Sequence, residues 1–194
     1  MILSILIPAI PERMDKVSKL AYHLNKQAEP FGSSVEILCL MDNMQMTIGE
    51  KRTRLKHMAM GKYFTFVDDD DWVTHDYVDE VLKAIVGTWP DVVTFDQITA
   101  IDGKPFKVSF GYGNLIEPAR QDASGNYVDI KRPPWHVCVW RAEAVEDCNF
   151  PYQNYDEDTA FVKSAILKIQ SSTHIDKVLH YYNYSSDLSR AHPE

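Results

Sequence analysis

The chain contains the stretch Phe64-Thr65-Phe66-Val67-Asp68-Asp69-Asp70-Asp71-Trp72, in which four aromatic or β-branched residues precede four consecutive aspartates. Aromatic and β-branched residues favour a strand, so the stretch predicts a short buried strand that delivers four carboxylates at its carboxyl end. In open α/β sheets, ligands bind beyond the carboxyl ends of the strands. This stretch therefore predicts the class of fold and the position of a site within it.

Strands and helices alternate on both sides of this stretch. Short apolar runs, of the kind buried on both faces of a parallel sheet, predict strands at 3–7, 35–41, 63–67 and 92–95. Apolar residues at helical spacing predict helices at 14–28, 49–60 and 76–86. The alternation specifies a three-layer α/β fold with a mostly parallel central sheet, and it directs attention to the loops at 8–13, 42–46 and 68–71.

The alternation breaks down after residue 100. Turn signals at Asp102-Gly103 and Ser124-Gly125-Asn126 predict a hairpin or an excursion over the sheet between 101 and 134. Further elements are expected as a strand at 137–140, a helix at 155–169 and a strand at 173–184. No repeat or Gly/Ser linker divides the chain, so residues 1–194 are expected to form one domain.

Composition limits the function classes. With 194 residues and 45% hydrophobic content, the chain can bury a sizeable core without a disulfide or structural metal, so any metal should serve chemistry. Cys39, Cys138 and Cys148 form no C-x-x-C pair and are expected to be reduced, largely buried thiols. No signal peptide or membrane-spanning stretch is apparent, which predicts a soluble protein in the cytoplasm, the host cytoplasm if the source is viral.

The net charge of −8 opposes sequence-blind binding to a nucleic-acid backbone. A basic run at Lys51, Arg52, Arg54, Lys56 and His57 departs from this average. On a helix, such a run is by default a solvated face, and the alternative is a local anion-binding patch.

The four aspartates at 68–71 repel one another. At an effective dielectric constant near 20, each close pair costs about 4 kcal/mol, so the cluster needs either solvent or a cation. Carboxylate oxygens suit Mg²⁺ or Mn²⁺, which are often shared with a ligand phosphate. The alternative is an acidic turn that caps the following helix.

Several segments together resemble the family 2 glycosyltransferases of the GT-A fold. They are the opening strand Ser4–Pro8, the basic helix and Ala-x-Gly-x-Tyr turn within 48–63, the strand and acidic motif at 66–71, the Glu157-Asp158 pair within 154–161, and the closing segment 178–190. The resemblance covers residues 2–8, 42–72 and 154–190, and it does not extend to 101–134.

The resemblance implies a metal-dependent, inverting glycosyltransferase that moves a sugar from a nucleotide-diphosphate donor, with a UDP-sugar favoured, to an acceptor hydroxyl. Residues 1–100 then bind the donor and Mn²⁺ or Mg²⁺, and residues 101–194 bind the acceptor. A divalent ion neutralises the diphosphate leaving group without proton transfer.

The resemblance also assigns roles to individual residues. Asp158 is the expected catalytic base, because a positioned carboxylate must take the proton of the attacking hydroxyl, and the adjacent Glu157 is the second expected catalytic residue. The alternative for this pair is an acidic helix N-terminus. Asp70 is the first expected metal ligand, with Asp68 as the second. The expected donor-binding residues are Pro8, Asp42, Arg52, Asp68 and Asp69.

Three further residues have two interpretations each. His136 is either a ligand for the metal or the acceptor, or a packed structural histidine. Trp72 and Trp135 are either sugar-stacking platforms or core residues.

The acceptor stays open. A saccharide or glycolipid is the first expectation. The alternative is a hydroxymethylated base of phage DNA, because the short chain hints at a bacteriophage protein. A nucleotidyltransferase is a different class, but it needs a Gly-rich phosphate loop, and residues 8–13 contain no glycine. A binding module without catalysis is the last alternative.

Overall fold

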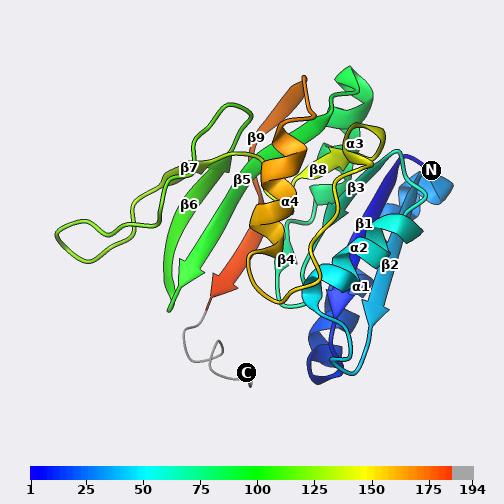
Figure 1. The fold of residues 1–194 in the computed structure, drawn as a ribbon, viewed down its shortest axis with the longest axis horizontal. Helices are drawn as coiled ribbons and strands as arrows, with labels where there is room; N and C mark the ends of the chain where they lie inside the picture. The colour runs from blue at the N-terminus through cyan, green and yellow to red at the C-terminus, as the bar shows by residue number, and fades with distance from the viewer. Residues whose placement is uncertain (185–194) are drawn as a thin grey trace.

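The structure is a computed structural model that describes residues 1–184 (Figure 1). The helices are α1 (Met14–Ala28), α2 (Ile48–Met58), α3 (Tyr77–Thr88) and α4 (Glu157–Ile166). The strands are β1 (Leu3–Ala9), β2 (Val35–Met41), β3 (Tyr63–Phe66), β4 (Trp72–Val73), β5 (Val92–Ile101), β6 (Lys104–Phe110), β7 (Ile130–Arg132), β8 (Val139–Arg141) and β9 (Ser172–Tyr184). Short 3₁₀ turns lie at Pro11–Arg13, Glu29–Ser34 and Glu143–Val145.

One mixed sheet joins all the strands in the described part of the chain. Its main path runs β2-β1-β3-β8-β5-β6-β7, while β9 pairs with β5 and β4 pairs with β9. Strand β1 is parallel to β2 and β3, and β8 is antiparallel to β3 and β5. Because the two longest pairings, β1 with β2 and β5 with β9, are parallel, most paired residues are parallel, as predicted.

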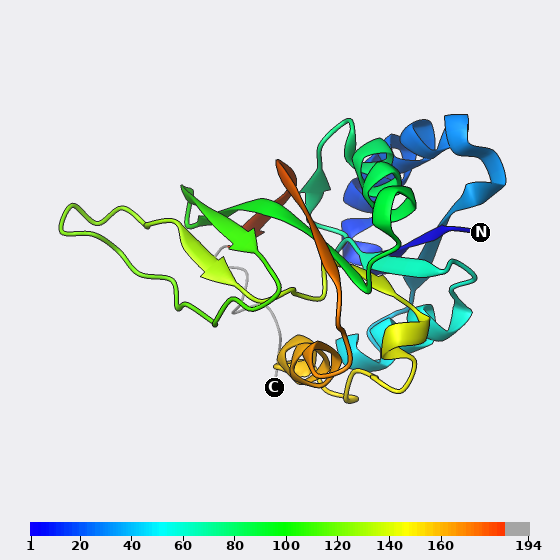
Figure 2. The same cartoon turned by 90° about the horizontal axis from the view of Figure 1, so that it is seen from above.

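Helices cover both faces of the sheet. Alternate residues of β1 point to opposite faces, so Leu3, Ile5 and Ile7 pack in a core with α1 and α3, whereas Leu6 packs in a second core with α2 and α4. Figure 2 shows these two helical layers on opposite sides of the strands. The predicted three-layer α/β arrangement is confirmed.

Strand β2 differs from the prediction of burial on both faces. It lies at the edge of the sheet, pairs only with β1 and is mostly half-buried. Cys39 on this strand is exposed, whereas Cys138 and Cys148 are buried as expected. An apolar run cannot distinguish a central strand from an edge strand, because position in the sheet depends on distant partners.

The excursion after residue 100 begins as the predicted hairpin. Asp102 and Gly103 have positive φ angles of 49° and 78° and turn β5 into β6. Strand β5 continues to Ile101, beyond the predicted end at Phe95, because β6 and β9 pair with its later residues. Figures 1 and 2 show β6, β7 and the loop between them extending away from the helical layers.

No helix within residues 1–184 is long and apolar enough to cross a membrane. The Ser-rich segment 185–190, which contributed to the family resemblance, lies outside the described residues.

Candidate active site

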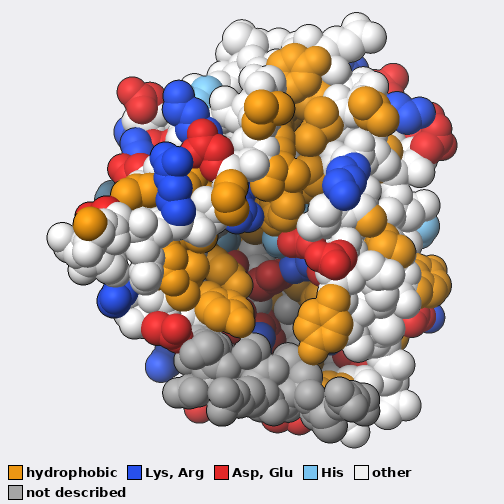
Figure 3. Space-filling view, turned by 60° about the vertical axis from the view of Figure 1, so that its left-hand side comes forward, with side chains coloured by type: hydrophobic (Ala, Val, Ile, Leu, Met, Phe, Trp, Pro, Cys, Tyr) orange, Lys and Arg blue, Asp and Glu red, His pale blue; other side chains and the backbone are white. Residues whose placement is uncertain are grey.

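A cavity of about 560 Å³ opens where the carboxyl end of β3 meets the amino end of α4. Asp68 and Asp71 lie on one side of it, and Asp158 lies on another. Apolar residues of β6 and β7 and the tyrosines of β9 complete the walls. Figure 3 shows a hollow in which acidic, basic and histidine side chains lie beneath an apolar rim.

The four consecutive aspartates separate into two groups. Asp68 and Asp71 border the cavity. Asp69 instead accepts hydrogen bonds from the Ile10 backbone N–H at 3.0 Å and from the Arg13 guanidinium at 2.7 Å. Arg13 also lies 3.0 Å from the Asp70 carboxylate. Arg13 therefore neutralises part of the cluster, a contact between distant segments that local sequence patterns did not reveal.

Burial and like charge act together on Asp70. Burial raises the pKa of its carboxyl, Arg13 lowers it, and Asp68 and Asp69 raise it further, so the pKa stands above its ordinary value. The Asp70 side chain keeps a quarter of its surface exposed. Asp70 is thus an accessible carboxyl, and Arg13 offsets only part of the burial and repulsion that act on its ionised form.

Asp71 and His180 form a buried pair at the inner end of the cluster. The Asp71 carboxylate lies 3.4 Å from His180 Nε2. Burial and the neighbouring Asp68 and Asp70 raise the pKa of Asp71 well above its ordinary value, while burial lowers the pKa of His180 to about 3. Burial therefore disfavours the charged forms of both Asp71 and His180.

Arg52 connects β3 to α4. Its guanidinium is buried and donates to both oxygens of Asp68, at 2.7 and 2.9 Å, and to the Glu157 carboxylate. Burial lowers the pKa of Arg52, but the charges of Asp68 and Glu157 raise it above the ordinary value. The same contact with Arg52 outweighs burial and lowers the pKa of Asp68. Arg52 thus joins Asp68 and Glu157 by hydrogen bonds across the base of the cavity.

The basic run on α2 is mostly not a solvated face. Lys51, Arg52 and Lys56 are buried, and only Arg54 and His57 are exposed. Lys56 donates to the carbonyls of Glu146 and Cys148 at 2.8 and 2.6 Å. The default expectation fails because three cations have carbonyl or carboxylate partners on distant segments.

Pro8 and Asp42, two of the expected donor-binding residues, lie at the ends of the neighbouring strands β1 and β2. Pro8 is buried in β1, opposite Leu40 of β2. Asp42 forms an ion pair with Lys51, whose ammonium also donates to the Ala9 carbonyl at 2.7 Å. Burial raises the pKa of Asp42, but Lys51 and two backbone N–H donors lower it below its ordinary value. Asp42 is therefore a fixed anion at this edge.

Asp158 and Glu157 point in different directions at the start of α4. Glu157 faces inward to Arg52, and only 7% of its side chain is exposed. Asp158 lines the cavity with 26% of its side chain exposed, and its two oxygens accept hydrogen bonds from Trp135 Nε1 at 3.0 Å and from the Thr159 backbone N–H at 2.7 Å. Both acids line the cavity, and Asp158 is the more exposed of the two.

His136 lies between the two groups of acids. Its Nε2 is 3.2 Å from Arg52 and 3.8 Å from Asp68, while its Nδ1 is 3.5 Å from Asp158. His136 is buried, and its Nδ1 has no hydrogen-bond partner among residues 1–184. The His136 imidazole thus lies between Asp68, which follows β3, and Asp158 at the start of α4.

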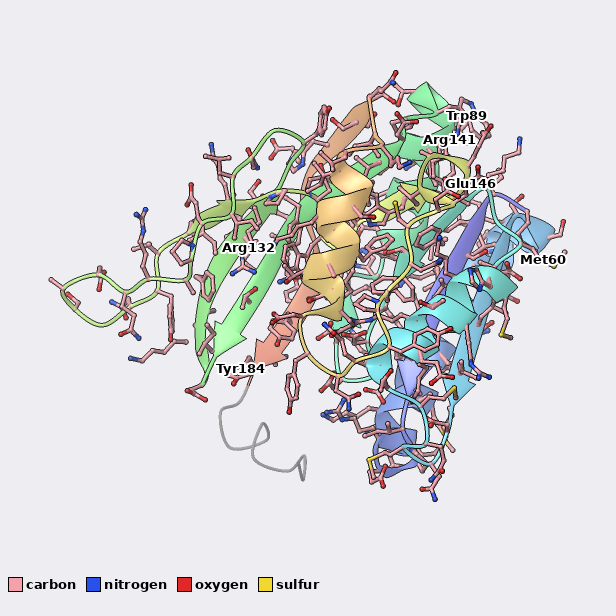
Figure 4. The ribbon with its side chains drawn as sticks, viewed as in Figure 1. Met60, Trp89, Arg132, Arg141, Glu146 and Tyr184 are labelled. Atoms are coloured by element: carbon pink, nitrogen blue, oxygen red, sulfur yellow. The ribbon has the colours of Figure 1, made fainter. Side chains whose placement is uncertain are left out.

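The two tryptophans occupy different places. Trp72 stacks on His23 of α1, with ring centroids 4.6 Å apart, and does not line the cavity. Trp135 lines the cavity, and the Arg132 guanidinium lies 5.5 Å from the centre of its ring. Figure 4 labels Arg132 on β7 and Tyr184 at the end of β9, two further residues of the cavity wall.

The comparison with solved structures identifies the class of fold. Chains that match this one include Staphylococcus aureus TarS 1–349, with a TM-score of 0.68 and 18% identity over 94% of this chain and 60% of that chain. TarS 1–349 in complex with UDP-GlcNAc matches with a TM-score of 0.65 and 15% identity over 100% of this chain and 62% of that one. These matches confirm the predicted α/β fold of the GT-A type.

The chain spans about three fifths of the length of these TarS structures. No protein-family model matches the chain, and no curated protein sequence matches it significantly.

Proposed function

We propose that this protein is a family 2 glycosyltransferase that transfers a sugar, with inversion, from a UDP-sugar to a hydroxyl of a saccharide or glycolipid acceptor. The observation that carries the proposal is the position of Asp158, an ionisable group open to a cavity that Asp68 and Asp71 also border. The complexes of TarS with UDP and with UDP-GlcNAc support a nucleotide-sugar donor.

The donor belongs at the edge formed by the carboxyl ends of β1, β2 and β3. Pro8, Asp42 and Asp69 lie there, and all three are held rigidly by the contacts described above. Fixed groups bind a ligand at lower entropic cost than mobile ones. In this proposal, residues 1–100 supply the donor side.

Arg52 acts on the donor side in a different way from the one first expected. Its two terminal nitrogens are engaged by Asp68 and Glu157, and it is buried, so the geometry favours a role in positioning these acids over direct contact with phosphate. Arg52 therefore links the donor side to the helix that carries Asp158.

The acidic cluster fits a divalent cation. The pKa of Asp70 is raised in part by Asp68 and Asp69, a repulsion that a cation would relieve, and the His136 nitrogen that faces the cluster is Nε2, 3.8 Å from the Asp68 carboxylate. Carboxylate and imidazole ligands suit Mn²⁺ and, for the carboxylates, Mg²⁺. We assign Asp70, Asp68 and His136 as the ligands. When bound, the ion supplies positive charge that neutralises the departing diphosphate.

Asp158 supplies the proton acceptor. The acceptor hydroxyl attacks the anomeric carbon as the bond from that carbon to the diphosphate oxygen breaks, and the hydroxyl proton passes to Asp158. Trp135 Nε1 and the Thr159 N–H hold the two oxygens of Asp158 in place. Glu157, whose pKa is raised by burial, stays with Arg52 and fixes the first turn of α4.

The cavity walls favour a saccharide over DNA as the acceptor. The aromatic residues of the wall are Trp135, Tyr155 in the loop before α4, and Tyr182 and Tyr184 of β9. Sugar rings pack on aromatic faces through their C–H groups. Three cations of the basic run are turned into the protein, so they cannot contact a phosphate backbone. In this proposal, residues 101–194 form the acceptor side.

The Asp158→Asn variant tests the proposal. Loss of the base should lower transfer from a UDP-sugar by about 100-fold or more, while UDP binding by calorimetry stays within a factor of about 2. The matched control is Asp147→Asn, the same change at an aspartate whose side chain is 80% exposed. Near wild-type transfer by a folded Asp158→Asn protein would refute the role of Asp158.

The donor assignment has its own test. Calorimetry with UDP and Mn²⁺ should show binding to the wild type that weakens strongly in Asp70→Asn. Equal affinity in both proteins would remove Asp70 from the donor site, whatever the result for Asp158.

A further inference from the structure

A second group of potential metal ligands lies outside the cavity, at an irregular point between β5 and β9. Asp96, His174 and Asp176 each direct one ligand atom toward the others, and these atoms lie within 4.8 Å of one another. None of the three lines the cavity. The group combines two carboxylates with one imidazole, a set that suits Zn²⁺ or Mn²⁺.

The pairing of β5 with β9 creates this group. Phe95 pairs with Ile175, but the next residue, Asp96, pairs with Val178, so two residues of β9 bulge from the ladder. Bulges re-aim side chains. The bulged Lys177 reaches α3, where it donates to Glu80 at 2.9 Å, and the adjacent Asp176 turns to Asp96 and His174.

Asp96 provides an independent sign of a missing ligand. The residue is only 4% exposed, yet its Oδ1 has no hydrogen-bond partner among residues 1–184. This oxygen lies 3.7 Å from His174 Nε2. Two ligands of a shared ion stand roughly 3 to 4 Å apart when each is about 2.1 Å from it, so the observed separation fits a common ion. A buried carboxylate oxygen without a partner is costly, and a cation would remove that cost.

His174 is held in the orientation that ligation requires. Its Nδ1 is 3.0 Å from the hydroxyl of Thr94, which is 1% exposed. If Nδ1 donates to this hydroxyl, the Nε2 lone pair faces the two carboxylates. Metal-bound histidines usually have such a partner on the second nitrogen.

Lys107 is the cation that competes for this site. Its ammonium lies 3.0 Å from Asp96 Oδ2, the oxygen on the far side from His174, and burial of Asp96 leaves room for few other partners. The group contains two carboxylates, and Lys107 pairs with one of them.

We propose that Asp96, His174 and Asp176 bind a divalent transition-metal ion such as Zn²⁺, with water completing its coordination. The ion ties β9 to β5 at the bulge. Because β9 carries Tyr182 and Tyr184 to the cavity, an ion at this point stabilises one wall of the cavity without taking part in the reaction.

Calorimetric titration with Zn²⁺ tests this site. The measurement is made on Asp70→Asn protein, so that the acidic cluster at the end of β3 contributes less to the signal. Adding His174→Asn should weaken Zn²⁺ binding about tenfold or more, and Lys107→Met should strengthen it by a factor of about 3 or more, because a competing cation is removed. The matched control is His57→Asn, at an exposed histidine on α2.

The result that overturns the proposal is equal Zn²⁺ affinity in the His174→Asn and His57→Asn proteins, or weaker binding after Lys107→Met. A second measurement uses protein without substitutions. Substoichiometric Mn²⁺ should broaden the NMR signals of the His174 imidazole, and a His174 signal that stays sharp while others broaden refutes the site. Neither measurement depends on sugar transfer, so this proposal and the proposed function fail separately.

Discussion

Replacement of Arg52 by methionine should destabilise the protein far more than an ordinary loss of surface charge. Methionine keeps most of the length and apolar stem of arginine but removes the guanidinium. The Asp68 and Glu157 carboxylates then lose the donor they share.

The magnitude follows from the exposure of the two acids. A quarter of the Asp68 side chain is exposed, so water can replace part of the lost contact, whereas Glu157 is 7% exposed and cannot be rehydrated in place. Removal of one partner of a buried ion pair costs about 3 to 5 kcal/mol. We expect a loss of about 3 kcal/mol, at the lower end, since Asp68 recovers some hydration.

Urea unfolding at pH 7 measures this loss. Arg54→Met is the matched control on the same helix, because the Arg54 side chain is 58% exposed and pairs only with Glu50 at i−4 in the described part of the chain; it should cost less than about 1 kcal/mol. Adding Glu157→Gln to Arg52→Met should restore part of the loss, since the buried charge is gone. Equal losses for Arg52→Met and Arg54→Met would refute the reasoning.

Three further changes test other parts of the structure. Asp91→Asn removes a carboxylate that accepts hydrogen bonds from the backbone N–H groups of residues 170–171. Burial raises the pKa of Asp91, but these bonds lower it below its ordinary value. The stabilisation from the ionised carboxylate therefore holds above about pH 4 and is lost at lower pH. The stability gap between Asp91→Asn and wild type should therefore shrink on acidification. Trp135→Phe removes the N–H donor to Asp158 and should lower kcat about tenfold, with UDP binding unchanged in calorimetry. Gly49→Ala places a Cβ 1.8 Å from a backbone carbonyl before α4 and should cost about 1 to 3 kcal/mol in urea unfolding.

The fold was largely predictable because its evidence is local. Apolar alternation identified β1, α1 and β3 near their observed bounds, and turn residues identified the turn between β5 and β6. The ends of helices were less predictable: α4 covers 157–166 instead of 155–169, because Asp156 adopts a left-handed conformation just before it. Such endpoints depend on loop geometry, which residue spacing does not encode.

The site was predictable as a set of acids but not as a set of contacts. The resemblance named Asp68, Asp70 and Asp158, and the structure brings Asp68 and Asp158 to one cavity. The bridge from Arg52 to Glu157 spans 105 residues of sequence, so no local pattern predicts it. The basic run itself was the available signal, because a cation on a helix that also packs against the sheet needs a carboxylate or carbonyl partner.

Strand β9 has a consequence for the order in which the chain is made. A ribosome releases β5 well before β9, and until β9 arrives the β5 edge from Val92 to Ile101 has no strand on that side. An unpaired apolar edge is a template for pairing with other chains. The nascent protein therefore passes through an interval in which its longest inner strand is open to aggregation, and the interval ends when β9 pairs with it.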